Sequence, residues 1–493
     1  MVETYEYDGY WWLPAHGPTG PPTDESRKLS GTLTIAKGEA KLSVLGSFGH
    51  GVLSTSESVT VFSPVASAVP RVLGLTTNGK PVTLESCVPV HGSTSFPGIG
   101  TTIYRSAAAV LGAWFSEDEE ISFQEIAVRT SELDTWVSVS GFASSITGET
   151  QPDTGHFVPT AFDVHFEPSP SIAIPLDHGT DARIDFQVRQ SGMRAVTVEV
   201  SISQTASIHI RCPDMQPLEG VWKLVNQLRN FLSLAIGRPE TILSVTGFRD
   251  DLIRQGSDSR SPLELFWPIP HNPDPPGRLL DPSEMLFTLP EADPSISDVM
   301  RAWFSHQDLF EPVLNLYFGM LYHPDMYSDV RFLAYAQAIE TYDFRRRDPH
   351  ELDPDAHRKR MAEIISGAPQ WEDWLRMRLA SSNYLVLDQR IRDVLGECPD
   401  VSAKIVGDAP EETDAFVRLF KRSRNYYTHY SPDLADKAAK GAELHLLTVR
   451  LRAIIEMSLL RELGFSCGAI DRILDRVQRY AEIHHFKAMV EQG

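Results

Sequence analysis

The spacing of apolar residues changes once along this 493-residue chain, and that change constrains the fold more than any other feature. Up to Cys212-Pro213, short runs alternate apolar and polar side chains, and turn residues such as Asn78-Gly79 separate them. Alternation is typical of half-buried strands, because successive side chains of a strand point to opposite faces, and Asn-Gly favours a tight hairpin. Residues 1–215 are therefore predicted to be rich in β-strands.

The predicted strands are short and follow one another closely. They lie near residues 31–35, 40–45, 71–76, 81–84, 121–128, 136–141, 162–166, 182–188, 195–202 and 207–211. So many short strands with frequent turns indicate a sandwich or a barrel.

Beyond residue 215 the apolar residues recur every three or four positions, as on one face of a helix. The first such run, residues 218–236, ends at Gly237-Arg-Pro239. Residues 256–296 are rich in Pro, Asp and Ser and are predicted to be an irregular connector. Further helices are expected near residues 297–321, 328–345, 355–366, 370–378, 385–396, 411–428, 434–464 and 467–488.

These patterns predict an α+β multidomain chain with three parts. Residues 1–215 form a β-rich, sandwich or barrel-like domain, residues 216–296 a helical and Pro-rich connector, and residues 297–493 an all-α helical bundle. The apolar stripe of the helix at 434–464 is broad enough for a bundle core with one edge left for a partner chain.

The net charge of −21 is concentrated in the first two thirds of the chain. From Arg331 onward there are 25 Lys and Arg against 26 Asp and Glu, a net charge of −1, so residues 1–330 carry −20. Such acidity excludes nonspecific binding of the whole chain to a polyanion, since nucleic-acid binding usually needs a basic surface. Residues 421–493 carry 12 basic against 9 acidic side chains, which leaves room for a local basic site.

The sequence predicts a cytoplasmic protein with no membrane span. No apolar run approaches the roughly 20 residues that cross a bilayer, and the acidic start of the chain lacks the apolar segment of a secretory signal. The four cysteines, Cys87, Cys212, Cys398 and Cys467, include no CxxC pair. This spacing argues against a zinc ribbon or a dense disulfide framework and suits a reducing compartment.

The residues best suited to chemistry lie in the segment Arg424-Asn425-Tyr-Tyr-Thr-His429. An imidazole with an ordinary pKa of about 6.5 exchanges protons at neutral pH and is able to accept the proton of a ribose 2′-hydroxyl. A guanidinium stays charged and grips a phosphate through two hydrogen bonds, which stabilises the charge of the transition state. The pair suits metal-free RNA cleavage that leaves a 2′,3′-cyclic phosphate and a 5′-hydroxyl.

The spacing sets a geometric condition on this pair. On a regular helix, residues five apart point roughly 140° away from each other. Arg424 and His429 therefore share a site only if the helix ends or bulges between them, or if two copies of the chain face each other. Pro432 indicates that the helix stops just after His429. Without further context, a surface Arg and a capping His explain the same residues.

That context resembles the ApeA-like group of the HEPN superfamily (higher eukaryotes and prokaryotes nucleotide-binding). Arg424-Asn425-x3-His429 near a helix end is similar to the Arg-x4–6-His motif of the superfamily, in which a polar residue follows the Arg. Residues 332–342 (FLAYAQAIETY) resemble part of the first helices of the ApeA-like HEPN group. Residues 9–14 (GYWWLP) are similar to the opening of the ApeA N-terminal domain, so the resemblance covers both halves of the chain.

The resemblance implies a helical HEPN bundle that dimerises, so that two Arg/His pairs line one RNA-cleaving cleft. It implies that Arg424 holds phosphate, that His429 is the general acid and base, and that Asn425 binds or orients. Glu340, acidic on an otherwise apolar helix face, is then expected to pair with Arg424, although an ordinary solvated residue explains it equally well. HEPN toxins that are silenced by nucleotidylation carry a Tyr two residues after the His, where this chain has Ser431.

The function implied by the resemblance is antiphage defence by abortive infection. It implies an RNA substrate, with tRNA among the candidates, a phage-derived protein trigger, and no cofactor or metal. The acidic β-rich domain would then act as sensor or restraint for the nuclease.

Two other functions remain open at this stage. A non-catalytic HEPN-like dimeric scaffold would carry a peptide- or glycan-binding β domain, with Tyr10, Trp11 and Trp12 as an aromatic platform, although packing of the first strand explains the same residues. A metal-dependent hydrolase is disfavoured, because the His and acidic residues form no ligand set with regular spacing.

Overall fold

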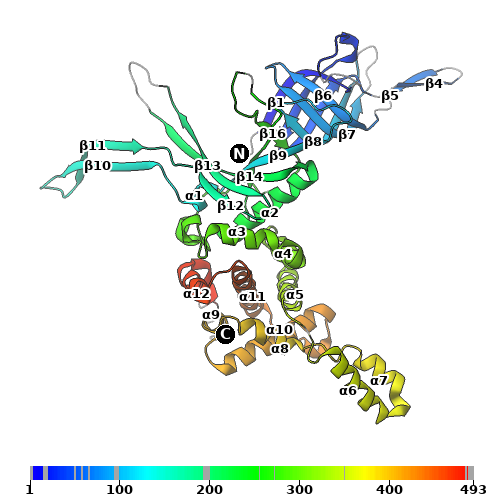
Figure 1. Cartoon of the computed structure of the whole chain (residues 1–493), viewed down its shortest axis with the longest axis vertical. Helices are drawn as coiled ribbons and strands as arrows, with labels where there is room; N and C mark the ends of the chain where they lie inside the picture. The colour runs from blue at the N-terminus through cyan, green and yellow to red at the C-terminus, as the bar shows by residue number, and fades with distance from the viewer. Residues whose placement is uncertain are drawn as a thin grey trace. The chain divides into compact units, whose positions relative to one another are not determined.

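The computed structural model describes residues 4–14, 20–48, 51–56, 59–64, 67–93, 99–192, 200–254, 256–270, 273–348, 350–483 and 486. The chain divides into two compact units (Figure 1). The first unit comprises Met1–Ser233 and Glu240–Leu280 and contains the strands, and the second comprises Leu234–Pro239 and Asp281–Gly493 and is helical. The prediction of a β-rich N-terminal part followed by a helical C-terminal part is confirmed.

Six antiparallel strands of the first unit close into a barrel. They are β1 (Thr4–Trp12), β2 (Leu29–Ala36), β3 (Glu39–Leu45), β6 (Val69–Thr76), β7 (Pro81–Ser93) and β8 (Thr101–Leu111). Their order is β8-β3-β2-β1-β6-β7, and β7 pairs back with β8 to complete the ring. Alternate residues point inward and form a core that includes Leu33, Val72 and Tyr104.

The tryptophans of β1 are buried and do not form an exposed platform, since Trp11 belongs to this core and Trp12 packs against Trp114. Trp11 and Trp12 are 0% and 2% exposed, and Trp11 Nε1 donates a hydrogen bond to the carbonyl oxygen of Gly31 at 3.0 Å. The Trp11 ring lies so close to Gly74 that a Cβ there would overlap it at 2.3 Å. Of the three aromatic residues, Tyr10 alone is exposed, so packing of the first strand explains the two tryptophans and the alternative of an aromatic platform is wrong.

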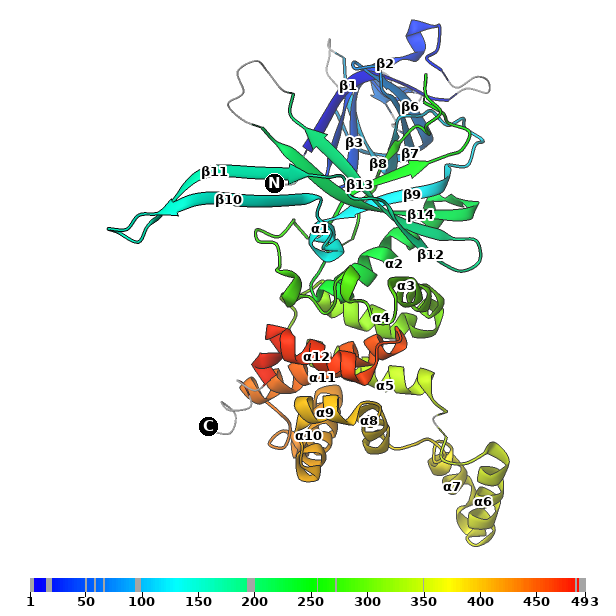
Figure 2. The same cartoon turned by 60° about the vertical axis from the view of Figure 1, so that its left-hand side comes forward.

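Six further strands extend the sheet from β8, all of them antiparallel. In order they are β16 (Leu263–Phe266), β15 (Ile242–Phe248), β9 (Ser122–Thr130), β14 (Ile202–Pro217), β13 (Asp181–Gln190) and β12 (Ile172–Pro175). One face of these strands is apolar and buried, with Ile126, Ile184 and Ile208 among its residues. Helices α1 (Leu133–Val137) and α2 (Leu218–Ile236) lie beside the strands, and α1 contacts β14 (Figure 2).

Two predictions in this unit are wrong. Residues 136–141 are not a strand, because α1 occupies their start and Trp136 packs its ring against Phe231 of α2, with ring centroids 5.8 Å apart. Residues 256–296 are not all irregular, because they include β16, which pairs with β15 and β8. The strand predicted at 195–202 falls mostly on residues outside the described ones.

Two hairpins form separate two-stranded sheets. They are β4 (Gly51–Ser56) with β5 (Val59–Pro64), and β10 (Phe142–Thr150) with β11 (Phe157–Phe166). The β10–β11 hairpin extends beyond the large sheet in Figures 1 and 2.

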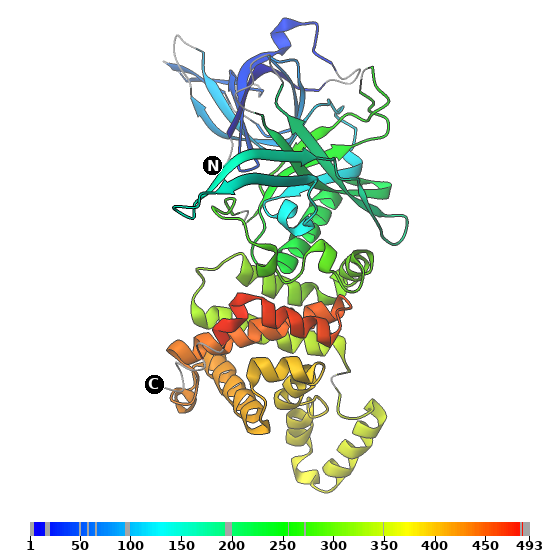
Figure 3. The same cartoon turned by 90° about the vertical axis from the view of Figure 1, so that its left-hand side faces the viewer.

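The second unit is a bundle of helices, coloured green to red in Figure 3. They are α3 (Ile296–Ser305), α4 (Gln307–Leu321), α5 (Ser328–Arg346), α6 (Pro354–Ser366), α7 (Glu372–Leu379), α8 (Leu387–Leu395), α9 (Pro399–Val406), α10 (Pro410–His429), α11 (Gly441–Glu462) and α12 (Cys467–Arg476). Helix α5 contacts α4, α8, α10 and α11, so it organises the bundle. A disulfide joins Cys398 to Cys467. None of the helices in the described part of the chain has the length and apolar character to cross a membrane.

Helix α11 is more enclosed than the sequence indicated. It begins at Gly441, because Pro432–Leu434 forms a separate 3-10 turn. Every residue of the stretch Ala453–Leu460 is buried, so this part of α11 is enclosed on all sides. Packing within one chain therefore explains the apolar residues of this stretch, which leaves no free edge for a partner chain there.

A buried carboxylate lies in the middle of α11. Glu456 accepts hydrogen bonds from the hydroxyls of Tyr317 at 2.7 Å and Tyr480 at 2.6 Å. It also pairs with Arg452 Nε at 2.9 Å and Arg479 Nη2 at 3.2 Å. Burial by itself raises the pKa of Glu456, but the two guanidinium charges and the two hydroxyls outweigh burial and lower it to about 2. This network ties α4 and α11 to the C-terminal segment.

Candidate functional site

The candidate residues are positioned by the packing of α10 on α5. The start of α10 has Pro410 in its first turn followed by two glutamates, which favour a helix N-terminus. Its buried face includes Phe420 and reaches Phe332 of α5, which also contacts Tyr427, with ring centroids 6.4 and 5.7 Å away. These aromatic contacts fix the last turns of α10 against the first turns of α5.

Arg424 and Glu340 form a two-point ion pair between these helices. Arg424 Nε lies 2.9 Å from Glu340 Oε1, and Nη2 lies 3.2 Å from Oε2. The side chains are 33% and 18% exposed, so the pair is only partly shielded from water. Asn425 Oδ1 accepts a longer hydrogen bond, 3.4 Å, from Arg424 Nη1. The structure thus brings together three of the four residues that sequence reasoning singled out.

A cavity of about 570 Å³ opens beside this pair, between α5, α8 and α10. Its lining includes Gln337, Glu340, Arg390, Arg424 and Thr428. Donors and charges thus converge on a space of the size that ligand sites usually have.

Arg390, on α8, is a second guanidinium of this cavity, and sequence reasoning missed it. It donates to the carbonyl oxygen of Glu340, and its Nε lies 2.8 Å from Asp343 Oδ2. Asp343 is buried and also accepts from Arg347 Nη1 at 2.9 Å. No sequence signal marks Arg390, because its role depends on how α8 packs against α5.

His429 lies apart from the cavity. It is the last residue of α10, it is exposed, and it is not among the residues that line the cavity. The helix is regular between Arg424 and His429, and it ends only at Tyr430, which has a left-handed φ of 49°. Within one chain the helix therefore neither ends nor bulges between Arg424 and His429. The remaining condition for a shared site is that two copies of the chain face each other.

Three tyrosines cluster around the end of α10. The rings of Tyr426 and Tyr430 have centroids 5.5 Å apart, and those of Tyr427 and Tyr430 are 6.2 Å apart. The hydroxyl of Tyr430 donates to Asp329 Oδ2 at 3.0 Å, and this hydrogen bond raises the pKa of Tyr430. Tyr430 is 57% exposed, so an aromatic ring lies next to His429 at the surface, where a nucleic-acid base is able to stack.

Metal ligands are not gathered at this site. In the part of the chain that the structure describes, no group of three or more His, Cys, Asp or Glu residues has the arrangement of a metal centre.

Both units contain regions that match the models of known protein families. Residues 6–303 match the model of ApeA N-terminal domain 1, and residues 333–469, which contain Glu340, Arg424 and His429, match the Apea-like HEPN model. No curated protein and no solved structure matches the chain. The C-terminal unit is therefore an HEPN domain, of a type that generally cleaves RNA and usually dimerises. The chain belongs to the ApeA-like HEPN family, and its two domains suggest an antiphage-defence protein.

Proposed function

We propose that this protein is a metal-independent endoribonuclease that acts in antiphage defence by abortive infection. The observation that carries the proposal is the position of Arg424, which is held by Glu340 at the edge of a cavity and remains one-third exposed. The family match supplies the class of reaction, and His429, five residues later on the same helix, supplies the acid–base group.

In the proposed reaction, His429 accepts the proton of a ribose 2′-hydroxyl. The 2′-oxygen then forms a bond to the adjacent phosphorus, and the bond from phosphorus to the 5′-oxygen breaks. The same His429, now protonated, returns the proton to the leaving 5′-oxygen through a water molecule. The products are a 2′,3′-cyclic phosphate and a 5′-hydroxyl.

Arg424 is proposed to bind the non-bridging phosphate oxygens during this step. A guanidinium offers two parallel donors, and its charge stabilises the charge that builds up in the transition state. Glu340 and Asn425 engage three of the five N–H groups of Arg424, which leaves two for a phosphate in the cavity. Asn425 holds the guanidinium from the other side.

The site is proposed to be assembled from two copies of the chain. Arg424 and His429 point away from each other on one regular helix, so facing copies are the remaining way to bring an Arg and a His to one phosphate. HEPN domains usually dimerise, which supports this arrangement. The exposed Tyr430 beside each His429 would then stack on the bases of the RNA.

The N-terminal domain is proposed to restrain the nuclease until a phage-derived protein acts on it. The two-unit organisation and the net charge of −20 on residues 1–330 support this role, because that charge repels RNA. Residues 1–215 are proposed to be the sensor and residues 297–493 the nuclease, while residues 216–296 link them in sequence and also supply β15 and β16 of the first unit. The proposed substrate is RNA, with tRNA among the candidates.

The proposal is tested in cells that carry wild type, Arg424→Ala, His429→Ala or the control Arg422→Ala. Arg422 is an exposed arginine on the same helix, so its loss removes the same charge outside the cavity. Strains matched for soluble protein are challenged with phages, and total RNA is assayed for 2′,3′-cyclic phosphate ends. We expect both site variants to lose protection and RNA cleavage, by roughly 100-fold or more, while the control behaves as wild type.

Protection that survives both substitutions would overturn the nuclease and favour a non-catalytic HEPN scaffold. Cleavage by the purified protein that stops in EDTA would overturn metal independence.

A further inference from the structure

A second and larger cavity lies in the first unit. It has a volume of about 1130 Å³ and is lined by residues of β1, β2, β9, β13, β14, β15, β16 and the loops next to them. Ligand sites usually occupy about 300–1,000 Å³, so this space is large enough for a small molecule.

The floor of this cavity is one polar face of the sheet. Ser207 and His209 of β14 line the cavity, while Ile208 and Ile210, which alternate with them, are buried on the opposite face. The neighbouring strands continue the pattern, because Arg129 of β9 lies opposite Ser244 of β15 and both line the cavity. The floor therefore offers hydrogen-bonding side chains from several adjacent strands.

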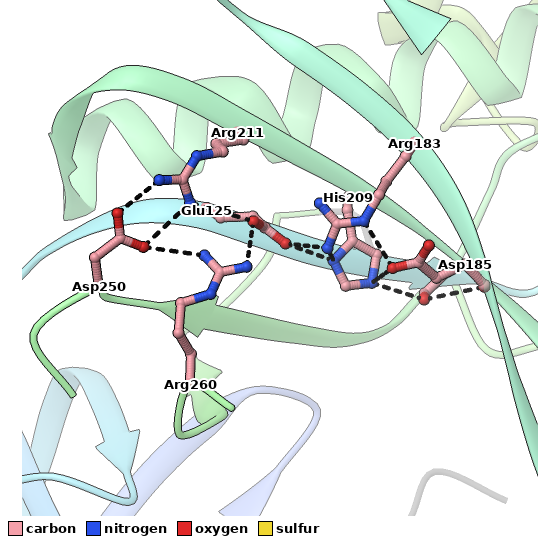
Figure 4. Close-up of polar contacts among 8 residues, drawn as sticks. Glu125, Arg183, Asp185, His209, Arg211, Asp250 and Arg260 are labelled. Carbon is pink, nitrogen blue, oxygen red and sulfur yellow. Dashed lines mark hydrogen bonds and ion pairs between the residues drawn. The ribbon is translucent and has the colours of Figure 1, made fainter. Parts of the chain in front are cut away.

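The floor is held in place by a network around a fully buried carboxylate, drawn in Figure 4. Glu125 lies 2.5 Å from Arg183, 2.6 Å from Arg260 and 2.8 Å from His209 Nδ1. Burial alone raises the pKa of Glu125, but the hydrogen bonds from His209, Arg183 and Arg260 hold it well below its usual range.

The arginines of this network are neutralised by its carboxylates. Arg183 also pairs with Asp185 at 2.8 Å, and Arg211 pairs with Asp250 at 2.6 Å. Three guanidinium groups thus face three carboxylates, counting Glu125, so the network fixes the floor and leaves no net positive charge for a ligand.

Arg129 differs from these arginines. Its Nε is buried and has no hydrogen-bond partner, and its guanidinium has no ion pair, in the part of the chain that the structure describes. A buried guanidinium donor without an acceptor is unfavourable, because the donor has lost its hydrogen bonds to water. Arg129 is therefore suited to receive an anionic group that enters the cavity.

An aromatic wall borders the same cavity. Tyr5 and Tyr7 of β1 are stacked, with centroids 6.5 Å apart, and Tyr5 lies 6.1 Å from Phe266 of β16. All three residues line the cavity, and Tyr5 is 40% exposed. Such a wall receives a planar ring by stacking.

We propose that this cavity binds a small anionic ligand with a planar ring, of the nucleotide class, with its anionic group on Arg129 and its ring against Tyr5 and Phe266. The lining of this cavity does not include Arg424 or His429, so this proposal does not depend on the proposed nuclease activity.

Titration calorimetry of the full-length protein tests the proposal with four ribonucleoside triphosphates, with adenosine, and with inorganic phosphate. At least one triphosphate should bind more tightly than adenosine or phosphate alone. Arg129→Gln should weaken that binding by at least about tenfold, whereas Arg105→Gln, an exposed arginine on β8 outside the cavity, should leave it unchanged.

A second variant separates the ring from the anion. Tyr5→Leu keeps Arg129 and should weaken binding of the triphosphate while leaving binding of inorganic phosphate as in wild type. Melting temperatures without ligand identify a variant that fails to fold. The proposal is overturned if no triphosphate binds, or if a folded Arg129→Gln protein binds as tightly as wild type.

Discussion

Among the glutamate–arginine pairs of the helical unit, the group around Glu456 and the pair of Glu340 with Arg424 differ most clearly in their exposure. Glu456 is completely buried, and two tyrosine hydroxyls and two guanidinium groups surround it. Glu340 pairs with one guanidinium that is one-third exposed and faces a cavity. Both groups join helices, but only the second leaves room for another molecule.

This difference separates a structural role from a chemical one. A sealed network has no position from which an incoming anion is able to reach the guanidinium groups, and removing one partner leaves a buried charge without compensation. A half-open pair contributes little to stability, because water screens it, yet it holds a guanidinium ready for a phosphate. We therefore expect substitutions at Glu456 to change stability and substitutions at Arg424 and Glu340 to change activity.

The largest effect on stability is expected from Glu456→Ala. It leaves Arg452 and Arg479 without their buried carboxylate, which typically costs about 3–5 kcal/mol. Urea unfolding followed by circular dichroism measures the change, with Glu443→Ala, near the start of the same helix, as the control. A loss below about 1 kcal/mol would show that the network does not hold the bundle together.

The same network predicts a dependence of stability on pH. Glu456 has a pKa of about 2 in the folded chain, below its ordinary value of 4.5, so its contribution is present above pH 4.5 and is lost as pH falls toward 2. The contribution amounts to about 3 kcal/mol. Urea unfolding at pH 7 and pH 3 should show a larger loss for wild type than for a folded Glu456→Gln variant, and equal losses would contradict the assignment.

A smaller effect, on activity alone, is expected from Glu340→Gln. The amide keeps the shape of the side chain but holds Arg424 less firmly, so the cleavage rate should fall by roughly tenfold. Because Glu340 acts through Arg424, the loss should appear in kcat, and Glu340→Gln in an Arg424→Ala background should cause no further loss. Additive losses would mean that Glu340 acts on its own.

The smallest effect is the change in stability caused by Arg424→Ala. The pair is partly exposed, so the free energy of unfolding should fall by about 1 kcal/mol or less. Urea unfolding of the variant beside Arg422→Ala measures it. A loss as large as that of Glu456→Ala would mean that Arg424 has a structural role. It would contradict the difference drawn between the Glu456 network and the Glu340–Arg424 pair.

Periodicity predicted the change from strands to helices, because the spacing of apolar residues reports which faces are buried. The pairing of Glu340 with Arg424 was expected from a family resemblance and not from periodicity. Periodicity could not predict β16, a short strand in a Pro-rich segment, because pairing with β8 and β15 decides its structure. Arg390 and Arg129 were missed for a similar reason, since helix packing and strand register, not local sequence, bring them to their cavities.

The central claim, a cleavage site shared between two copies of the chain, is tested most directly by mixing two inactive variants. Arg424→Ala and His429→Ala are each purified, allowed to exchange subunits and assayed for RNA cleavage. If each site takes its Arg from one copy and its His from the other, the mixed dimer has one complete site. Random exchange should then restore about a quarter of the wild-type activity. If the mixture stays inactive although mass spectrometry detects mixed dimers, the shared site is contradicted.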